Sequence, residues 1–234
     1  MQAIKITGLV KRYKNLIAVD GLNLEIQHGE LFSLLGVNGA GKTTTIKMLT
    51  CLTKPTQGDA WVGGYSLARE PEQIKRRIGV SPQETAVAPG LTVTEKLELM
   101  CGVHGFPKET RNSRIEEAAH RLGLDAVSGK KAGKLSGGWQ RRLSIAMALI
   151  SQPEILFLDE PTLGLDVLAR SELWDVIRAL KGNATVILTT HYMEEAEALS
   201  DRVAIMKDGK LLLCETADRI KEIAKTDRFE EAFV

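Results

Sequence analysis

The amino-acid sequence predicts an α/β fold, with a mixed, mainly parallel sheet, an N-terminal antiparallel β subdomain and an inserted helical subdomain. Near-alternate apolar positions within 4–35 are typical of half-buried strands. Two apolar strands flank a helix within 155–188, which is the βαβ rhythm of parallel pairing. Between these parts, 94–151 has helical periodicity interrupted by glycine and proline.

The expected elements alternate along the chain. The expected strands cover 4–6, 19–26, 31–35, 155–158, 185–188, 203–206 and 211–213, and the expected helices cover 44–49, 94–101, 113–122, 137–151 and 167–181. We expect one unit over 1–234. In it, 1–83 and 153–220 form the core, 84–152 is the helical subdomain and 221–234 is a C-terminal tail.

Composition indicates an ordinary globular protein. Of 234 residues, 44% are hydrophobic, and 31 basic side chains nearly balance 30 acidic ones. This balance gives no field that would attract nucleic acid, so we expect no nucleic-acid partner. Cys51, Cys101 and Cys214 are too far apart for a disulfide framework or a close-spaced metal cluster. We interpret them as core residues in a reducing cytosol.

The sequence shows no export signal and no membrane span. Residues 1–14 alternate apolar and polar positions, unlike a signal peptide. The longest apolar run, Ile145–Ile150, is far shorter than the roughly 20 residues that cross a bilayer. We therefore expect a cytoplasmic protein, in which any membrane part of the function is supplied by another chain.

A glycine-rich loop, Gly36–Thr43, separates the expected strand 31–35 from the helix 44–49. Its pattern, Gly-x-x-x-x-Gly-Lys-Thr, lets successive backbone N–H groups converge on phosphate oxygens at the positive end of the helix. Lys42 is expected to reach the β and γ phosphates of ATP, and Thr43 to bind Mg²⁺. The loop predicts a P-loop NTPase core, against the alternative of a chance match in a turn. The residues expected to contact ATP here are Gly36, Asn38, Gly39, Ala40, Gly41, Lys42, Thr43 and Thr44.

The apolar strand 155–158 ends in two carboxylates, Asp159 and Glu160. A buried strand that delivers acids at its C-terminal edge places them beside the phosphate loop. Asp159 suits Mg²⁺, directly or through water, and Glu160 suits a general base. Without the phosphate loop a solvated Asp-Glu turn would be an equally good interpretation, but its presence favours the catalytic one.

Leu135-Ser136-Gly137-Gly138 begins a helix and can present N–H groups and a hydroxyl to an anion. By its physics alone it is no more than a good helix start. With the phosphate loop before it and the Asp-Glu strand after it, however, the chain resembles the nucleotide-binding domain of the ATP-binding cassette (ABC) family over residues 3–220. The resemblance implies head-to-tail pairing, in which Ser136 and Gly138 of one copy close over ATP held by the other.

The resemblance implies roles for four further residues, and three of them have a structural alternative. Tyr13 resembles the aromatic that stacks on adenine, or it packs in a sheet. Gln83 resembles the glutamine that contacts Mg²⁺ and the attacking water. His191 resembles the switch histidine that hydrogen-bonds the γ-phosphate, although a lone histidine at a strand end is more often structural. Asp166 resembles the residue that links two sites across the dimer, or it is a helix N-cap.

The chain departs from the common family pattern at Val37, Trp139, Leu163 and Val167. None of these departures removes a phosphate, metal or base group. Trp139 and Leu163 are expected near the dimer interface, where they would alter how tightly it closes and slow the turnover. Three other histidines match no motif and are expected in turns or on the surface: His28, His104 and His120.

Together these features predict an ATPase that drives transport as a homodimer. Water positioned by Glu160 and His191 would attack MgATP in line, while Lys42 and Mg²⁺ stabilise the developing charge. Closure on ATP would move a separate integral membrane permease docked near 84–110, which would hold the protein on the cytoplasmic face of the cell membrane. The stretch 191–197, with the ending Phe229–Phe233, resembles ATPases of ABC-2 type exporters of drugs, ions or polysaccharides.

Two alternatives stay open. One is a soluble ABC ATPase that acts on nucleic acid or in assembly, although the chain between Lys42 and Leu135 is too short for a long coiled coil and the charge is neutral. The other is an ATP-gated module with little hydrolysis, which the presence of Glu160 and His191 argues against.

Overall fold

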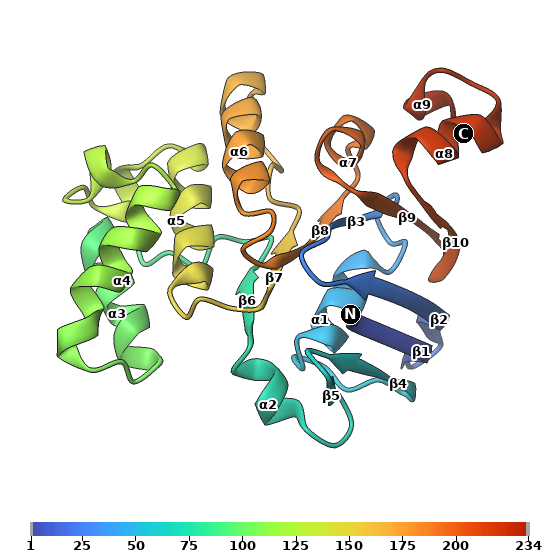
Figure 1. Ribbon diagram of the computed structural model, residues 1–234, viewed down its shortest axis with the longest axis horizontal. Helices are drawn as coiled ribbons and strands as arrows, with labels where there is room; N and C mark the ends of the chain where they lie inside the picture. The colour runs from blue at the N-terminus through green and yellow to red at the C-terminus, as the bar shows by residue number, and fades with distance from the viewer. Residues whose placement is uncertain (1, 233–234) are drawn as a thin grey trace.

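Two sheets form the frame of the structure, a computed structural model that describes residues 2–232 (Figure 1). The antiparallel sheet has the order β2-β1-β4-β5. Its strands are β1 (Gln2–Tyr13), β2 (Leu16–Gln27), β4 (Gln57–Val62) and β5 (Tyr65–Ser66). The second sheet has the order β10-β9-β3-β8-β7-β6. Its strands are β3 (Leu31–Leu35), β6 (Ile78–Ser81), β7 (Ile155–Asp159), β8 (Thr185–Thr190), β9 (Arg202–Lys207) and β10 (Lys210–Glu215).

The pairing of the second sheet is parallel from β6 through β7, β8 and β3 to β9, and β10 adds an antiparallel edge. Parallel strands of this kind are covered on both faces, and β3 and β7 are buried along their whole length. The predicted α/β class, with its mainly parallel sheet and antiparallel β subdomain, is confirmed.

The helices divide into groups around the sheets (Figure 1). In chain order they are α1 (Lys42–Leu49), α2 (Pro71–Lys75), α3 (Val93–Val103), α4 (Lys108–Arg121), α5 (Gly137–Leu149), α6 (Val167–Ala179), α7 (Met193–Leu199), α8 (Ala217–Ala224) and α9 (Phe229–Ala232). α3, α4 and α5 gather at the left, away from the antiparallel sheet. Thr92 and Glu95 form a capping box that fixes the start of α3. None of the helices within residues 2–232 is long and apolar enough to cross a membrane.

The apolar residues of the six-stranded sheet pack into separate clusters on its two faces. In β7, Leu156 and Leu158 join the cluster formed with α3 to α6. Ile155 and Phe157 alternate with them and join the cluster shared with α1 and the antiparallel sheet. Period-two alternation therefore lets one strand serve both cores, because successive side chains point to opposite faces.

The end of the described chain folds back onto the sheet. Ile220 and Phe229 are buried in a third cluster that includes Ala196 of α7. The expected division at 220/221 falls inside α8, and Phe229 is the buried residue within 221–232. Residues 233–234 of the expected tail lie outside the described residues.

The cysteines only partly match their interpretation as core residues. Cys101 is fully buried, whereas Cys51 and Cys214 are half-buried at the margin of a cluster. The Cys214 thiol contacts the Arg202 guanidinium at 2.9 Å. All three thiols are free, as the wide spacing predicts. The three unassigned histidines are exposed, as expected.

We expect Phe157→Ala to lower the free energy of unfolding by about 3–5 kcal/mol, because the side chain is fully buried and its loss leaves a cavity. Urea denaturation measures the change. Leu212→Ala, on β10 and 60% exposed, serves as the control and should change it little. Equal losses in the two variants would contradict the described packing of β7.

Candidate nucleotide-binding site

The phosphate loop bridges β3 and α1 at the edge where β3, β7 and β8 end (Figure 1). Close approach of the backbone dictates glycine at two of its positions. A Cβ on Gly36 would lie 2.5 Å from the carbonyl oxygen of Met206. A Cβ on Gly41, whose φ is 100°, would lie 2.5 Å from the carbonyl oxygen of Ala18. The motif therefore fixes the loop's path. Within the loop, the N–H groups of Gly36 and Ala40 donate to the carbonyl oxygens of Thr190 at 3.3 Å and Val37 at 3.1 Å.

Lys42 is folded back over the phosphate loop. Its side chain is 4% exposed, and Nζ donates to the carbonyl oxygens of Gly36 at 2.8 Å and Val37 at 3.3 Å. Nζ also lies 3.6 Å from Glu160 Oε1, which is similarly buried. The ammonium therefore lies between the loop and the candidate base. A phosphate oxygen could replace the two carbonyl oxygens as the acceptor of its hydrogen bonds.

Asp159 and Glu160 are held by Thr189, the neighbouring residue on β8. The Thr189 hydroxyl donates to Asp159 Oδ1 and accepts the backbone N–H of Glu160 at 2.9 Å. Thr43 Oγ1 donates to the same Asp159 oxygen at 3.1 Å. Glu160 has a φ of 47°, a left-handed conformation that costs a non-glycine residue about 1–2 kcal/mol. Thr189 helps to hold this strained turn, which redirects the chain as β7 ends.

The hydroxyl and carboxylate oxygens of Thr43 and Asp159 suit Mg²⁺, a hard cation. No cluster of three or more histidine, cysteine, aspartate or glutamate side chains that could hold a metal occurs within residues 2–232. Mg²⁺ is commonly held by one or two carboxylates together with substrate phosphates, so two protein oxygens beside a phosphate loop fit this mode.

A hollow of about 660 Å³ brings most of the predicted residues together. It is lined by Tyr13, Leu16, Ile17, Ala18, Asn38, Gly39, Ala40, Gly41, Lys42, Thr43, Thr44, Gln83, Glu160, Leu163, His191 and Asp208. Tyr13, at the end of β1, is 43% exposed, so it is not a buried sheet residue. Leu16 and Ile17 also line the hollow and add apolar surface beside Tyr13. The sequence pattern did not predict these two residues as part of the site.

His191 and Gln83 enter the hollow from separate directions. His191 Nδ1 lies 3.2 Å from Glu160 Oε2, without the alignment of a hydrogen bond. Gln83 is fixed through its backbone, because Arg141 of α5 donates to the carbonyl oxygens of Pro82 at 2.7 Å and Gln83 at 2.6 Å. Burial lowers the pKa of the Arg141 guanidinium, and the Asp159 carboxylate opposes that shift. Sequence reasoning missed this arginine, which joins α5 to the site.

Five predicted residues are not among those that line the hollow. Gly36 and Asp159 lie beside it, bonded to the lining residues Lys42 and Thr43. The other three are Ser136, Gly138 and Asp166. Ser136 and Gly138 stand at the start of α5, where the Ser136 hydroxyl makes no capping bond. Asp166 caps α6 by accepting the N–H of Ala169 at 2.9 Å, which is the alternative that the sequence left open. Trp139, expected near a dimer interface, is half-buried and packs against the core of the helical region.

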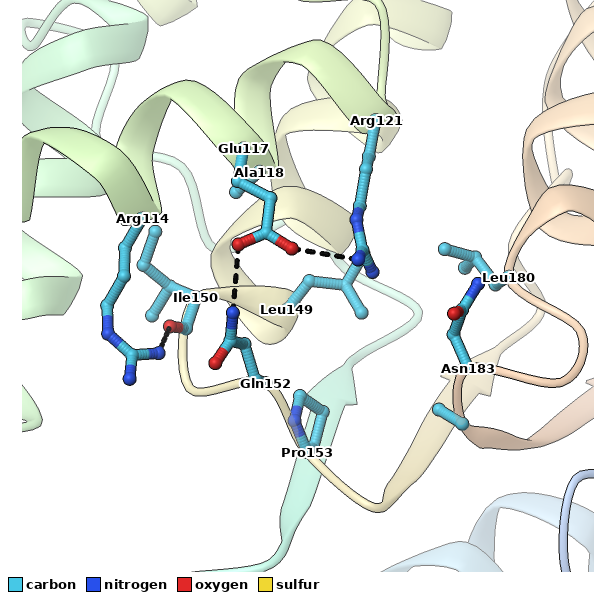
Figure 2. A pocket seen from close by; sticks show the side chains of 11 residues that line it. Arg114, Glu117, Ala118, Arg121, Leu149, Ile150, Gln152, Pro153, Leu180 and Asn183 are labelled. Carbon is cyan, nitrogen blue, oxygen red and sulfur yellow. Dashed lines mark hydrogen bonds and ion pairs between the residues drawn. The ribbon is translucent and has the colours of Figure 1, made fainter.

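A second hollow, of about 150 Å³, lies between α4, the end of α5 and the connection from α6 to β8 (Figure 2). Glu117 accepts a hydrogen bond from Gln152 at 2.8 Å and pairs with Arg121 at 2.8 Å. Arg114 donates to the carbonyl oxygen of Ile150 at 3.2 Å. These charged groups are engaged by protein atoms, and the phosphate loop is absent from the lining, so this hollow is separate from the candidate site.

Comparison with models of protein families shows which family the chain belongs to. A family model described as ABC transporter matches residues 19–163, from β2 past the Asp-Glu strand. The chain belongs to the ABC transporter family. A model described as an AAA domain, putative AbiEii toxin, Type IV TA system, also matches residues 131–197 of this ABC ATPase.

Relatives of this ABC ATPase include transport proteins and a solved dimer. It is 42% identical to the daunorubicin/doxorubicin resistance ATP-binding protein DrrA of Streptomyces peucetius, over 94% of this chain and 67% of that protein. It is 40% identical to the phospholipid-transporting ATPase ABCA3 of Homo sapiens, over 94% of this chain but only 13% of that protein. The dimeric post-hydrolysis structure of the ATP-binding cassette MJ0796, bound to ADP and Pi, matches with a TM-score of 0.82 at 30% identity, covering 91% of this chain and 98% of that one.

In this ABC ATPase we expect Thr189→Val to lower both stability and ATP hydrolysis. The change removes a buried hydroxyl that holds Asp159 and Glu160, and a lost buried hydrogen-bond partner costs about 1–3 kcal/mol. Urea denaturation and a phosphate-release assay measure the two effects.

Thr185→Val is the matched control, because Thr185 is buried at the other end of β8 and bonds the N–H of Gly29. It should lower stability while ATP turnover in the folded protein stays near the parent value. A Thr189→Val protein that turns over ATP as fast as this control would contradict the positioning of Asp159 and Glu160 by Thr189.

Proposed function

We propose that this ABC ATPase binds MgATP in the 660 Å³ hollow and hydrolyses it with Glu160 as the general base. The observation that carries the proposal is the position of Glu160, which is 7% exposed and lies beside both Lys42 and His191. A buried carboxylate 3.6 Å from the ammonium of Lys42 is suited to orient a water for in-line attack.

The proposed division of labour follows from the contacts in the site. Lys42 exchanges its bonds to Gly36 and Val37 for oxygens of the β and γ phosphates, and loop N–H groups from Asn38 to Thr44 bind the remaining oxygens. Tyr13 offers an exposed aromatic face to adenine. Thr43 and Asp159, with Gln83 nearby, hold Mg²⁺, which supplies positive charge to the developing phosphate anion. His191 orients the γ-phosphate and, with Glu160, the attacking water.

We further propose that the complete site needs two copies of the chain. Ser136, Gly138 and Asp166 lie outside the hollow of their own chain, at helix starts where N–H groups and small residues are accessible. In a head-to-tail homodimer, Ser136 and Gly138 cover the γ-phosphate of the opposite copy and Asp166 links the two sites. The dimeric state of MJ0796 bound to ADP and Pi supports this arrangement.

The transport role that we propose is export through a separate integral membrane permease. The drug-resistance function named for DrrA and the phospholipid transport named for ABCA3 support it. The helical region offers a docking surface on α3, where Leu99 is 49% exposed and Val103 is 71% exposed. Apolar side chains that project from one helix are suited to burial against a partner. The chain would then work on the cytoplasmic face of the cell membrane.

We expect Glu160→Gln to retain ATP-dependent dimerisation and to lose nearly all hydrolysis, by about 10²–10⁴-fold, because an amide cannot take the proton of water. Size-exclusion chromatography with MgATP and a phosphate-release assay measure the two outcomes. Glu154→Gln, at the exposed opposite end of the same strand region, is the matched control and should hydrolyse at the parent rate. Equal hydrolysis by the parent and Glu160→Gln would refute the assignment of the base, and a parent with little hydrolysis would favour the ATP-gated module.

We expect Val103→Asp to abolish co-purification with the proposed membrane permease, because a carboxylate buried in an apolar contact is costly to desolvate. Co-expression and affinity capture in detergent measure it, and ATP hydrolysis by the isolated chain should not change. Leu212→Asp, an exposed apolar position on β10, is the control. Capture that Val103→Asp leaves intact would contradict docking on α3, and capture of a DNA-repair protein would favour the non-transport ATPase.

A further inference from the structure

A column of stacked side chains connects α6 to the candidate base. The Arg170 guanidinium lies 4.3 Å from the centre of the Tyr192 ring. The Tyr192 ring lies 4.2 Å from the His191 ring, with 39° between their planes. His191 in turn is the residue whose Nδ1 lies 3.2 Å from Glu160 Oε2. Three successive contacts therefore run from a helix outside the hollow to the group proposed to activate water.

A buried carboxylate joins α7 to α6, the helix that carries Arg170. Glu195 of α7 is fully buried, and its Oε1 accepts the indole N–H of Trp174 on α6 at 3.1 Å. Burial raises the pKa of the Glu195 carboxyl, and the positive charge of Arg170 opposes that rise. Arg170 Nε is buried and has no hydrogen-bond partner within residues 2–232. The guanidinium therefore contacts the Tyr192 face, and no bond through Nε holds it within residues 2–232.

Little else fixes the orientation of the His191 ring. Its Nδ1 has no hydrogen-bond partner in the described part of the chain, and its side chain is 28% exposed. Next to it, the Tyr192 N–H donates to Thr190 Oγ1 at 2.9 Å, which fixes the backbone from which both rings project. The Tyr192 ring is thus the packing surface against which the histidine lies.

We propose that Arg170 and Tyr192 are positioning residues, which hold His191 beside Glu160 and make that placement depend on the position of α6. The inference rests on the proposed function, because it gives His191 a role at the γ-phosphate. Arg170 lies one turn beyond Asp166, which caps α6 and is proposed to cross the dimer interface. Movement of the start of α6 on pairing would therefore reach His191 through two stacked contacts, without a change in the phosphate loop.

The first test uses NMR to measure the chemical shifts of the His191 ring protons in the protein without nucleotide. The Tyr192 ring shifts the resonances of the adjacent His191 ring protons, which are assigned by their loss in His191→Gln. We expect Tyr192→Leu to abolish that shift and Tyr192→Phe, which keeps the ring face, to restore it. Arg170→Met should change the His191 resonances, and Arg178→Met should not. Arg178 lies further along the same helix, where it is exposed and pairs with Asp175.

The second test measures steady-state ATP hydrolysis by the folded variants. Arg170→Met and Tyr192→Leu should each lower kcat roughly tenfold or more, with KM for ATP within about twofold, since misplaced catalytic groups affect the reacting state more than substrate binding. The double variant should be no slower than either single one, because both interrupt one column. Arg170→Lys, which keeps the charge, covers the case in which Arg170→Met fails to fold.

The outcomes separate this inference from the proposed function. A parent protein that does not hydrolyse ATP would refute the proposed function, while the NMR comparison would still decide whether the column orients His191. His191 resonances unchanged in both Tyr192→Leu and Arg170→Met would overturn the inference. An increase in KM with unchanged kcat would also overturn it, since that result assigns the two residues to ATP binding.

Discussion

The site depends on parallel strands that end together at one edge of the six-stranded sheet. β3 delivers the phosphate loop, β7 delivers the two carboxylates, and β8 delivers the threonine that holds them. The register between β7 and β8 pairs Asp159 directly with Thr189. That register is fixed by buried residues on both faces of β7. A slip by one residue would move each side chain of β7 to the opposite face of the sheet and would also separate Asp159 from Thr189.

The contacts of Lys42 join the phosphate loop to the candidate base. Its ammonium stands between two loop carbonyls and Glu160, and the side chains of Lys42 and Glu160 are both largely removed from water. A buried carboxylate without a partner would be costly, so the lysine offsets the burial of Glu160 while no phosphate is present. A γ-phosphate competes for the same ammonium. Binding of substrate would therefore loosen the hold on the base at the time when the base is needed.

The parts of the site that are local in sequence could be predicted from it. The loop Gly36–Thr43 directly follows a predicted strand and precedes a predicted helix, and the apolar run before Asp159 predicts a buried strand. Thr189 could not be singled out, because its role depends on the register of a strand far along the chain. The role of Arg141 could not be predicted for a related reason. Helical periodicity predicts that Arg141 lies in a helix, but it does not predict that the guanidinium reaches the carbonyl oxygen of Gln83. For Asp166 the sequence offered two interpretations, and the capping bond shows that one of them operates in a single chain.

That capping bond has a consequence for the association of two chains. If the Asp166 carboxylate exchanged the N–H of Ala169 for a group of an opposite subunit, the first turn of α6 would lose its cap, and Val167 and Leu168 in that turn are each 77% exposed. Loss of an N-cap costs a helix about 1 kcal/mol, and a symmetric pair incurs it twice. In the proposed homodimer, this cost would oppose closure until contacts to a shared nucleotide exceed it.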